Sequence, residues 1–179
     1  MTEPSAGVIT IAIIGGTGKE GKGLAYRWAK AGYPIIIGSR SVEKATAAAD
    51  ELNRMLPVNP VVRGMENPAA AHEADLVVLT VPYAAHVSTL ESIREFLPGK
   101  VLVDVTVPLV PPKVTRVQMP AAGSAAQEAQ SVLGAEVQVV SAFQNISYEH
   151  LLHEEKVECD VLVCGGNKTA RAAVLVLVE

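Results

Sequence analysis

The segment VITIAIIGGTGKEG, residues Val8–Gly21, passes from an apolar run into a turn rich in glycine. The apolar run at 8–14 predicts a buried β-strand, and the apolar spacing of three and four residues that follows predicts a helix over 20–30. Between the two, three glycines fit the pattern G-x-G-x-x-G: Gly16, Gly18 and Gly21. The pattern alone is weak, but between a strand and a helix it is typical of a loop that holds a pyrophosphate.

Each glycine of this loop has its own expected task. Gly16 allows a tight turn, Gly18 lets the backbone approach the pyrophosphate, and Gly21 lets the helix pack closely on the strand. The helix that follows offers unpaired N–H groups and the positive end of its dipole to the phosphates. The alternative is an ordinary glycine-rich turn. We predict that the whole loop binds the cofactor, through Gly16, Thr17, Gly18, Lys19, Glu20 and Gly21.

The remainder of the chain alternates apolar runs with amphipathic segments. Strands alternating with helices at this spacing form βαβ units. The predicted fold is α/β: a doubly wound, mostly parallel Rossmann sheet with helices on both faces, forming a single dinucleotide-binding domain over residues 1–179, of which 1–7 are expected to be disordered. Further strands are expected at 34–37, 61–62, 75–81, 101–105, 137–140 and 160–164, and further helices at 42–56, 85–96, 124–133 and 168–178.

Composition narrows the classes of partner. The chain has 179 residues and a net charge of −4, which gives no support for binding to nucleic acid or to an anionic membrane. It contains no run of about 18 apolar residues that could span a membrane. Its first residues lack the basic and apolar regions of a signal peptide. We therefore expect a cytoplasmic protein whose partners are small-molecule cofactors.

Few residues of this chain could form a metal site or a disulfide framework. Cys159 and Cys164 are too few for either, and we expect both to be buried free thiols near a strand. His150 and His153 are three residues apart and could bind a metal, but a solvated helix face explains them better. No nucleophile motif is present. We therefore predict no metal site and no covalent catalysis.

The residues after the second expected strand bear on which dinucleotide binds. An NAD enzyme usually carries Asp or Glu there, to accept hydrogen bonds from the ribose hydroxyls. This chain reads Gly38-Ser39-Arg40-Ser41, without an acid, and Lys44 follows one turn into the helix. Arginine can pair with a 2′-phosphate and serine can donate to it. The sequence therefore favours NADP(H), with Glu43 expected to point away from the adenosine. A solvated helix start is the alternative for Arg40 and Lys44.

Three later segments are expected to surround the reacting ring of the cofactor. Two of them follow strands whose carboxyl ends meet at the edge where open α/β sheets bind ligands. The third would meet the ring of the hydride acceptor. The residues predicted to bind are Thr80, Val81 and Pro82 in the first segment, Val107 in the second, and Gln144 and Asn145 in the third.

Hydride transfer makes few demands on side chains. It requires chiefly that the donor and acceptor carbons be held about 3–3.5 Å apart, while the cofactors supply the electronics. We therefore predict no catalytic side chain. Asp104, at the end of an expected strand, either faces the cofactor or anchors the loop that follows.

Several of these motifs resemble those of the NADPH-dependent coenzyme F420 reductase family (deazaflavin:NADP oxidoreductases). The resemblance implies that Thr17, Ser39, Arg40 and Lys44 hold the 2′-phosphate. It also implies a homodimer, with coenzyme F420 near 143–145 exchanging a hydride with NADP(H) at its C5. Family members continue past the position of Glu179, so we expect this chain to lack a C-terminal segment that helps to build the deazaflavin pocket. The similar motifs are Ile14–Gly18, Gly21–Ala25, Gly38–Arg40, Thr80–Pro82, Ser141–Asn145 and Val163–Gly166.

Two other functions fit the same cofactor site. The chain could reduce a different acceptor with NADPH, because imine reductases, 3-hydroxyacid dehydrogenases and some ferric reductases begin with a similar domain. Those enzymes need a further helical domain. The chain could also be a catalytically silent NADP-binding module that pairs with a partner, because its last expected helix is apolar and needs a covering surface.

Overall fold

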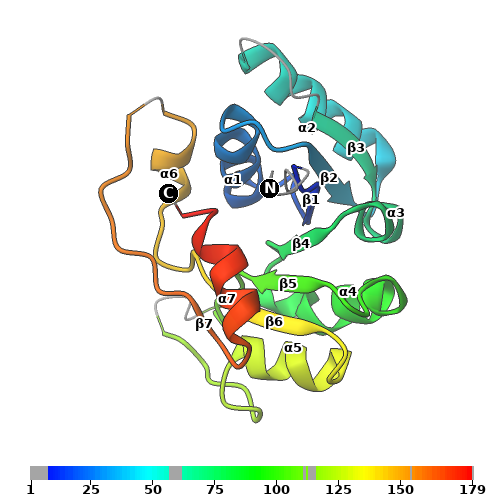
Figure 1. Ribbon diagram of the computed structural model, residues 1–179, viewed down its shortest axis with the longest axis vertical. Coiled ribbons are helices and arrows are strands. Elements are labelled where there is room, and N and C mark those ends of the chain that lie inside the picture. The colour runs from blue at the N-terminus through cyan, green and yellow to red at the C-terminus, as the bar shows by residue number, and fades with distance from the viewer. Residues whose placement is uncertain (1–7, 57–61, 111, 113–115, 154, 179) are drawn as a thin grey trace, which may run out of the picture.

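The computed structural model describes residues 8–56, 62–110, 112, 116–153 and 155–178, so the expectation for 1–7 lies outside it. Within this part of the chain, seven strands form one sheet in the order β3-β2-β1-β4-β5-β6-β7 (Figure 1). Every neighbouring pair is parallel except β6 and β7. This is the predicted doubly wound sheet with one antiparallel edge strand. The strands are β1 (Ile11–Ile14), β2 (Ile35–Ser39), β3 (Val62–Glu66), β4 (Leu76–Leu79), β5 (Val101–Asp104), β6 (Gln138–Ser141) and β7 (Cys164–Gly165).

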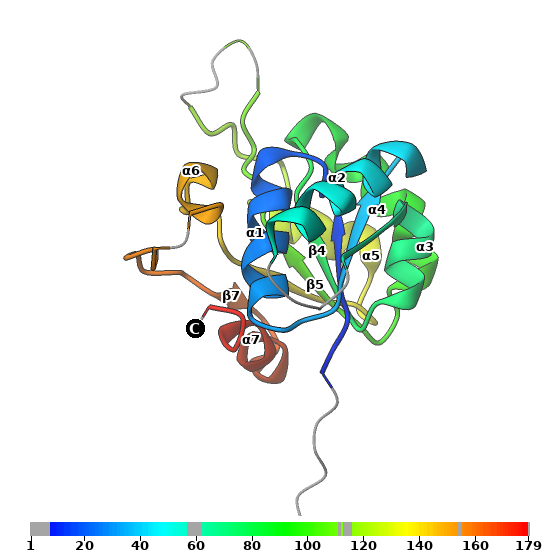
Figure 2. The same cartoon turned by 90° about the horizontal axis from the view of Figure 1, so that it is seen from above.

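Helices cover both faces of the sheet, as predicted. In Figure 2, α1, α6 and α7 lie on one side, and α3 and α4 on the other. Helix α1 follows β1 and α2 follows β2, so both begin at the edge where these parallel strands end. The helices are α1 (Lys19–Lys30), α2 (Val42–Met55), α3 (Asn67–Glu73), α4 (His86–Ile93), α5 (Ala125–Leu133), α6 (Tyr148–Leu151) and α7 (Lys168–Leu175), with the 3₁₀ helices η1 (Tyr83–Ala85) and η2 (Arg94–Phe96).

Alternate side chains of the central strands serve two separate apolar cores. Ile11 and Ile13 pack with residues of α1, α2 and α7. Ala12 and Ile14 pack with residues of α3, α4 and α5. All four side chains are fully buried. The segment reads as one continuous apolar run because a parallel strand that is covered on both faces has no polar side.

The expected edge strand at 61–62 is longer than predicted. It runs from Val62 to Glu66 and pairs with β2 on one side only. The side-chain amide of Asn53, in α2, bonds both the N–H and the C=O of Val62, at 2.9 and 2.8 Å. This side chain therefore fixes the start of the strand. Residue 61 lies outside the described part of the chain.

Two expectations near the C-terminus are wrong. Residues 160–163 form no strand, and β7 is only Cys164–Gly165, paired antiparallel with β6. The two cysteines are exposed rather than buried. Both errors share a cause: β7 lies at the outer edge of the sheet, and Cys159 lies in a segment without regular structure, where side chains have few neighbours.

Helices α3 and α6 are additional to those predicted. They contain seven and four residues, too few to display the apolar periodicity by which helices are recognised. Helix α3 starts with Asn67-Pro68, and proline suits the first turn because its missing N–H needs no partner there. None of the helices in the described residues is long and apolar enough to cross a membrane.

Candidate functional site

A cleft of about 980 Å³ lies at the carboxyl ends of the central strands. Open α/β sheets bind ligands at this edge, in the crevice where the strand order reverses. Its walls come from the glycine loop, the tip of β2 with the start of α2, and the loops after β4 and β5. Of the residues predicted to bind the cofactor, Gly16 and Gly21 are buried in the glycine loop, and the lining contains Thr17, Gly18, Lys19, Glu20, Ser39, Arg40, Lys44, Thr80, Val81, Pro82 and Val107.

Close backbone contacts shape the glycine loop. Gly15 has a φ of 75°, in the left-handed region that favours glycine. A Cβ on Gly16 would lie 2.7 Å from the carbonyl oxygen of Ile13, and a Cβ on Gly21 would lie 2.6 Å from Gly16 Cα. A Cβ on Gly18 would come no closer than 3.7 Å to another atom. The protein's own packing therefore requires Gly16 and Gly21, whereas it leaves room at Gly18.

The first turn of α1 presents backbone N–H groups beside this loop. Gly18 is the N-cap and has no side chain that could accept hydrogen bonds from them. The amide of Lys22 is the first in α1 to bond back to the turn, donating to Gly18 O at 2.9 Å. The earlier N–H groups and the helix dipole make this turn suitable for an anion. Lys19 adds a positive charge in the same wall.

The tip of β2 combines hydroxyl and cationic groups. Ser39 is buried, and its Oγ accepts a hydrogen bond from the Ser41 amide at 3.3 Å. Arg40 and Lys44 are exposed, and no acidic side chain of the described residues pairs with either. Two unpaired cations next to a serine suit a phosphate group.

Glu43 lies outside the cleft lining, and its carboxylate bonds the first residue of its own helix start. Its Oε2 accepts a hydrogen bond of 2.6 Å from the hydroxyl of Ser41, which does line the cleft. This hydrogen bond lowers the pKa of Glu43. Ser41 is the N-cap of α2, where an acid in the first turn readily reaches back to the cap. The Ser41 hydroxyl is therefore already engaged by its own helix.

Glu20 is the acidic side chain among the cleft-lining residues. Its Oε1 is buried and has no hydrogen-bond partner within the described structure. Burial raises the pKa of Glu20 from 4.5 to about 7, because the charged form loses its hydration. Near neutral pH much of the population is the neutral acid, which can donate a hydrogen bond to a phosphate oxygen instead of repelling it.

Asn67 lines the cleft although the sequence reasoning did not single it out. It is 5% exposed, and its Oδ1 has no hydrogen-bond partner among the described residues. A Cβ on Gly38 would lie 2.9 Å from this oxygen, so the glycine makes room for the amide under the tip of β2. Leaving such a group unpaired costs about 1–3 kcal/mol, which a ligand hydroxyl could offset. In sequence, Asn-Pro before an alanine run looks like an ordinary helix start.

The loops after β4 and β5 are held in place by side-chain hydrogen bonds. Thr80 Oγ1 donates to the carbonyl oxygen of Ile14 at 3.1 Å, tying its loop to β1. Asp104 is fully buried, and its Oδ1 accepts a hydrogen bond of 3.0 Å from the Thr106 amide. Asp104 is not part of the cleft lining. Of its two expected roles, the structure supports the loop anchor.

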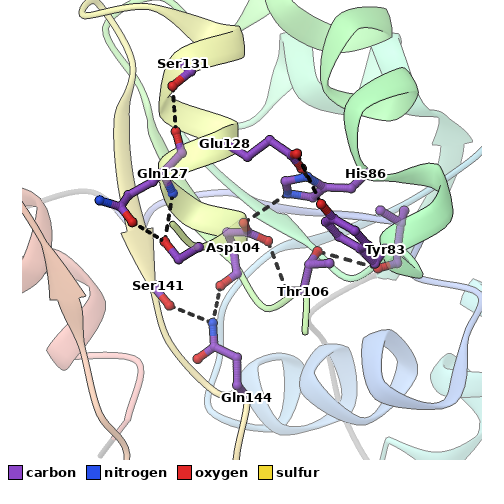
Figure 3. Close-up of polar contacts among 11 residues, drawn as sticks. Tyr83, His86, Asp104, Thr106, Gln127, Glu128, Ser131, Ser141 and Gln144 are labelled. Atoms are coloured by element: carbon purple, nitrogen blue, oxygen red, sulfur yellow. Dashed lines mark hydrogen bonds and ion pairs between the residues drawn. The ribbon is translucent and has the colours of Figure 1, made fainter. Parts of the chain in front are cut away.

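A buried histidine joins these loops to helix α5 (Figure 3). His86 Nε2 lies 3.0 Å from Asp104 Oδ2, and Nδ1 lies 3.0 Å from Glu128 Oε2. Tyr83 donates a hydrogen bond of 3.1 Å to the other oxygen of Glu128. Burial lowers the pKa of His86, but the two carboxylates outweigh burial and raise it above 6.5. Sequence reasoning missed this network because its members come from four separate elements and share no motif.

The third predicted segment does not reach the cleft with its side chains. Gln144 Nε2 donates to the carbonyl oxygen of Asp104 and to Ser141 Oγ, both at 2.7 Å. Asn145 Nδ2 donates to the carbonyl oxygen of Asp160 at 2.6 Å. Neither residue lines the cleft. The side-chain amide nitrogens of both residues are therefore engaged within the protein.

The segment also carries an unusual backbone. Phe143 has a φ of 71°, which is rare for a bulky residue and sets a sharp turn directly after β6. Its ring is buried and meets Trp28 edge to face, with the ring centres 5.5 Å apart. This contact holds the turn against α1.

Histidine, cysteine and carboxylate side chains do not gather elsewhere in the described structure. Among the described residues no group of three or more could hold a metal ion. His150 and His153 are exposed, in agreement with a solvated face.

A family model described as coenzyme F420-dependent NADP oxidoreductase matches residues 10–108. The chain belongs to this family. The matched region contains the glycine loop, the tip of β2, the loop after β4 and the start of the loop after β5, and so every residue of the cleft lining except Leu109.

Two curated relatives, both named F420-dependent NADP reductase, extend the match beyond this region. The protein from Methanocaldococcus jannaschii is 44% identical over 172 residues, which cover 92% of this chain and 76% of the relative. The protein from Methanothermobacter thermautotrophicus is 43% identical over 178 residues, which cover 96% of this chain and 77% of the relative. The family assignment therefore holds over most of the chain.

Solved structures agree with the fold. A structure from Arthrobacter sp. FB24, described as a candidate F420-dependent NADP-reductase, has a TM-score of 0.77 at 27% identity and covers 95% of this chain and 79% of that one. Pyrroline carboxylate reductase from Plasmodium falciparum, solved with NADP bound, has a TM-score of 0.62 at 18% identity. The superposition covers 95% of this chain and 54% of the reductase chain. The second likeness concerns the fold alone.

Proposed function

We propose that this chain transfers a hydride between NADP(H) and coenzyme F420, with NADP(H) bound in the cleft. The observation that carries the proposal is the pair of unpaired cations, Arg40 and Lys44, next to Ser39 at the tip of β2. Membership of the F420-dependent NADP oxidoreductase family supports coenzyme F420 as the second substrate.

The walls of the cleft suggest how NADP(H) lies. Ser39, Arg40 and Lys44, with Thr17, would bind the 2′-phosphate. The glycine loop and the first turn of α1, which includes Lys19 and Glu20, would bind the pyrophosphate. The nicotinamide would then lie against the loops after β4 and β5, which contribute Thr80, Val81, Pro82 and Val107.

The acceptor would approach the nicotinamide from the side of residues 143–145. Gln144 and Asn145 would act there by fixing the backbone of the segment, because their side chains are engaged within the protein. The hydride passes directly between the nicotinamide C4 and the deazaflavin C5, and reduction of the deazaflavin takes up one proton from water. The protein's task is to hold the two carbons about 3–3.5 Å apart.

We also infer that the chain acts as one NADP-binding domain and forms a homodimer; the cytoplasmic location expected from the sequence stays a prediction. Apolar side chains near the end of the chain support the dimer: Leu162 is 74% exposed, and Leu175 and Val176 are also exposed. A second copy could cover them. Sedimentation velocity would contradict this part of the proposal by giving a monomer at every concentration.

The cofactor preference is tested by replacing Arg40. Arg40→Ala should weaken NADPH binding by about 1.5–3 kcal/mol, roughly 10- to 150-fold, because a charge-assisted bond to the phosphate is lost. NADH lacks the phosphate, so its affinity should stay the same. Isothermal titration calorimetry measures both affinities, and Arg54→Ala, near the other end of α2, is the matched control. Equal losses for NADPH and NADH would show that Arg40 does not bind the 2′-phosphate.

A further inference from the structure

Hydride transfer as proposed above gives no task to the polar side chains that are hydrogen-bonded around the buried His86. These side chains, Tyr83, His86, Asp104 and Glu128, are called the His86 network below. We propose that His86 is a positioning residue that fixes the nicotinamide end of the cleft by binding Asp104 and Glu128 at the same time. The inference rests on the proposed function, because it concerns the same cofactor.

Each carboxylate that His86 binds also holds a wall of the cleft. The second oxygen of Asp104 accepts the amide of Thr106, which lines the cleft after β5. The second oxygen of Glu128 accepts the hydroxyl of Tyr83, which lines the cleft after β4. His86 therefore links the two loops through their side chains, in addition to the hydrogen bond of 3.5 Å from the Thr106 hydroxyl to the carbonyl oxygen of Val81 (Figure 3).

The third segment near the acceptor is tied to the same point. The backbone carbonyl of Asp104 accepts the side-chain amide of Gln144 at 2.7 Å. Movement of Asp104 would consequently displace Thr106, which its side chain binds, and Gln144, which its backbone carbonyl binds. The adenosine end of the cleft, at Ser39 and Arg40, shares no hydrogen bond with the His86 network in the described structure. Loss of His86 should therefore act on one end of the bound cofactor only.

Stability alone does not explain such a cluster. The His86 side chain is fully buried, that of Asp104 is 1% exposed and that of Glu128 is 22% exposed. Burying charged groups costs so much hydration that apolar side chains of similar volume are often as stable or more stable. Hydrogen bonds between polar groups have defined directions, whereas apolar contacts do not. Such bonds are therefore suited to hold two loops at a fixed spacing.

The geometry also requires one extra proton in the network. Neutral imidazole carries a single N–H and can donate to one carboxylate, yet both ring nitrogens lie 3.0 Å from carboxylate oxygens. The proton lies on the imidazole or on one of the two carboxyl groups. When it is lost, a ring nitrogen and a carboxylate face each other with lone pairs only, and one of the two links opens.

Among the described residues, three charged or titratable groups lie around His86. They are Asp104 from β5, Glu128 from α5 and Tyr83 from η1. The titratable side chains of the neighbouring elements α3 and η2 do not contact His86 in the described structure. In α3, His72 meets the ring of Phe96 and Glu73 pairs with Arg63. In η2, Arg94 and Glu95 are exposed. A pH effect at this end of the cleft would thus come from the His86 network.

The experiment compares two ligands that share the adenosine end. Isothermal titration calorimetry measures the affinities of NADP⁺ and of 2′,5′-ADP, which lacks the nicotinamide half, for wild type and for His86→Leu. We expect His86→Leu to weaken NADP⁺ about tenfold or more and to change 2′,5′-ADP less than about twofold. The matched control is His72→Leu, a histidine on the neighbouring helix, which should change neither affinity.

A second variant keeps the test decisive if His86→Leu does not fold. Glu128→Ala removes a partly exposed partner and leaves the bond between His86 and Asp104 in place. It should weaken NADP⁺ and spare 2′,5′-ADP in the same way. As the pH rises above the raised pKa of His86, the preference for NADP⁺ over 2′,5′-ADP should fall more in wild type than in His86→Leu, where Glu20, among the described residues, still titrates beside the bound cofactor.

Four results would overturn the inference. Equal weakening of both ligands by His86→Leu, or by Glu128→Ala where the first variant does not fold, would indicate a general structural role. Unchanged NADP⁺ affinity in a folded variant, or identical pH profiles in wild type and His86→Leu, would show that the network does not act on the nicotinamide half. Wild-type protein that binds neither ligand would overturn the proposed function as well, so the two failures can be told apart.

Discussion

At the residue scale, the cleft sets three cations against one carboxyl group whose charge depends on pH. Lys19, Arg40 and Lys44 all line the cleft, as the sequence predicts for a site that receives phosphates. Glu20 stands in the same wall, where a permanent negative charge would oppose them. Its buried, unpartnered oxygen favours the neutral acid, so the site is more positive than its composition suggests.

The buried Glu20 predicts a stability that depends on pH. Its pKa is about 7 in the folded protein, against 4.5 for an ordinary glutamate, so the folded protein holds this proton between these two pH values. The contribution of Glu20 to the free energy of unfolding should therefore fall as the pH rises from about 4.5 to about 7, and should be level above it. Glu20→Gln, which is always neutral, should lack this fall.

Thermal unfolding between pH 4 and 8 measures the effect. The melting temperature of Glu20→Gln, relative to wild type, should rise between pH 4.5 and 7. Glu91→Gln, an exposed glutamate on α4, is the control and should follow wild type throughout. Parallel curves for wild type and Glu20→Gln would contradict the raised pKa.

Sequence reasoning found the residues of the site that belong to motifs and missed those that do not. Arg40 and Lys44 were identifiable because a known position, the end of the second strand, lacked its usual acid. Asn67 and His86 had no such marker, because their importance arises from what Gly38, Asp104 and Glu128 bring near them in space. Gln144 and Asn145 were expected to meet the ring of the hydride acceptor, but their side-chain amide nitrogens donate to backbone carbonyl oxygens of Asp104 and Asp160, outside the cleft lining.

At the scale of elements, the glycine loop and α1 form a unit in which two glycines serve the fold and one leaves space. Gly18 has an extended backbone with a φ of −74°, which any residue can adopt, and a Cβ there meets no close atom. Gly21 has no such room, because a Cβ would lie 2.6 Å from Gly16 Cα and 2.7 Å from Thr80 Oγ1. The same substitution should therefore have different consequences at the two positions.

Gly18→Val should fold normally and lose both NADPH and NADH, because the branched side chain would occupy the place of the pyrophosphate. Gly21→Val should instead lower the free energy of unfolding by about 1–3 kcal/mol or more, because α1 must move away from the loop. Urea unfolding measures the stability of each variant, and calorimetry measures cofactor binding. Unchanged affinity of Gly18→Val for either dinucleotide would show that the loop is only a turn.

At the scale of the whole molecule, the buried centre of the sheet was predictable and its rim was not. The run at 8–14 indicated a parallel strand because both of its faces are covered, and the strand order reverses beside this strand, β1. At the edge, the segment 160–163 is apolar enough to suggest a strand but has no neighbour to pair with. The local pattern of apolar residues predicts which strands are buried, whereas the pairing of a strand at the edge of a sheet depends on the rest of the fold.

We conclude that this chain exchanges a hydride between NADP(H) and coenzyme F420. The most direct measurement mixes the purified protein with NADPH and oxidised coenzyme F420 and follows the visible absorbance of the deazaflavin, with NADH in a parallel reaction. We predict a rapid loss of absorbance with NADPH, about tenfold or more faster than with NADH, because the phosphate contributes at least 1.4 kcal/mol. No loss with NADPH, or an equal rate with NADH, would contradict the claim.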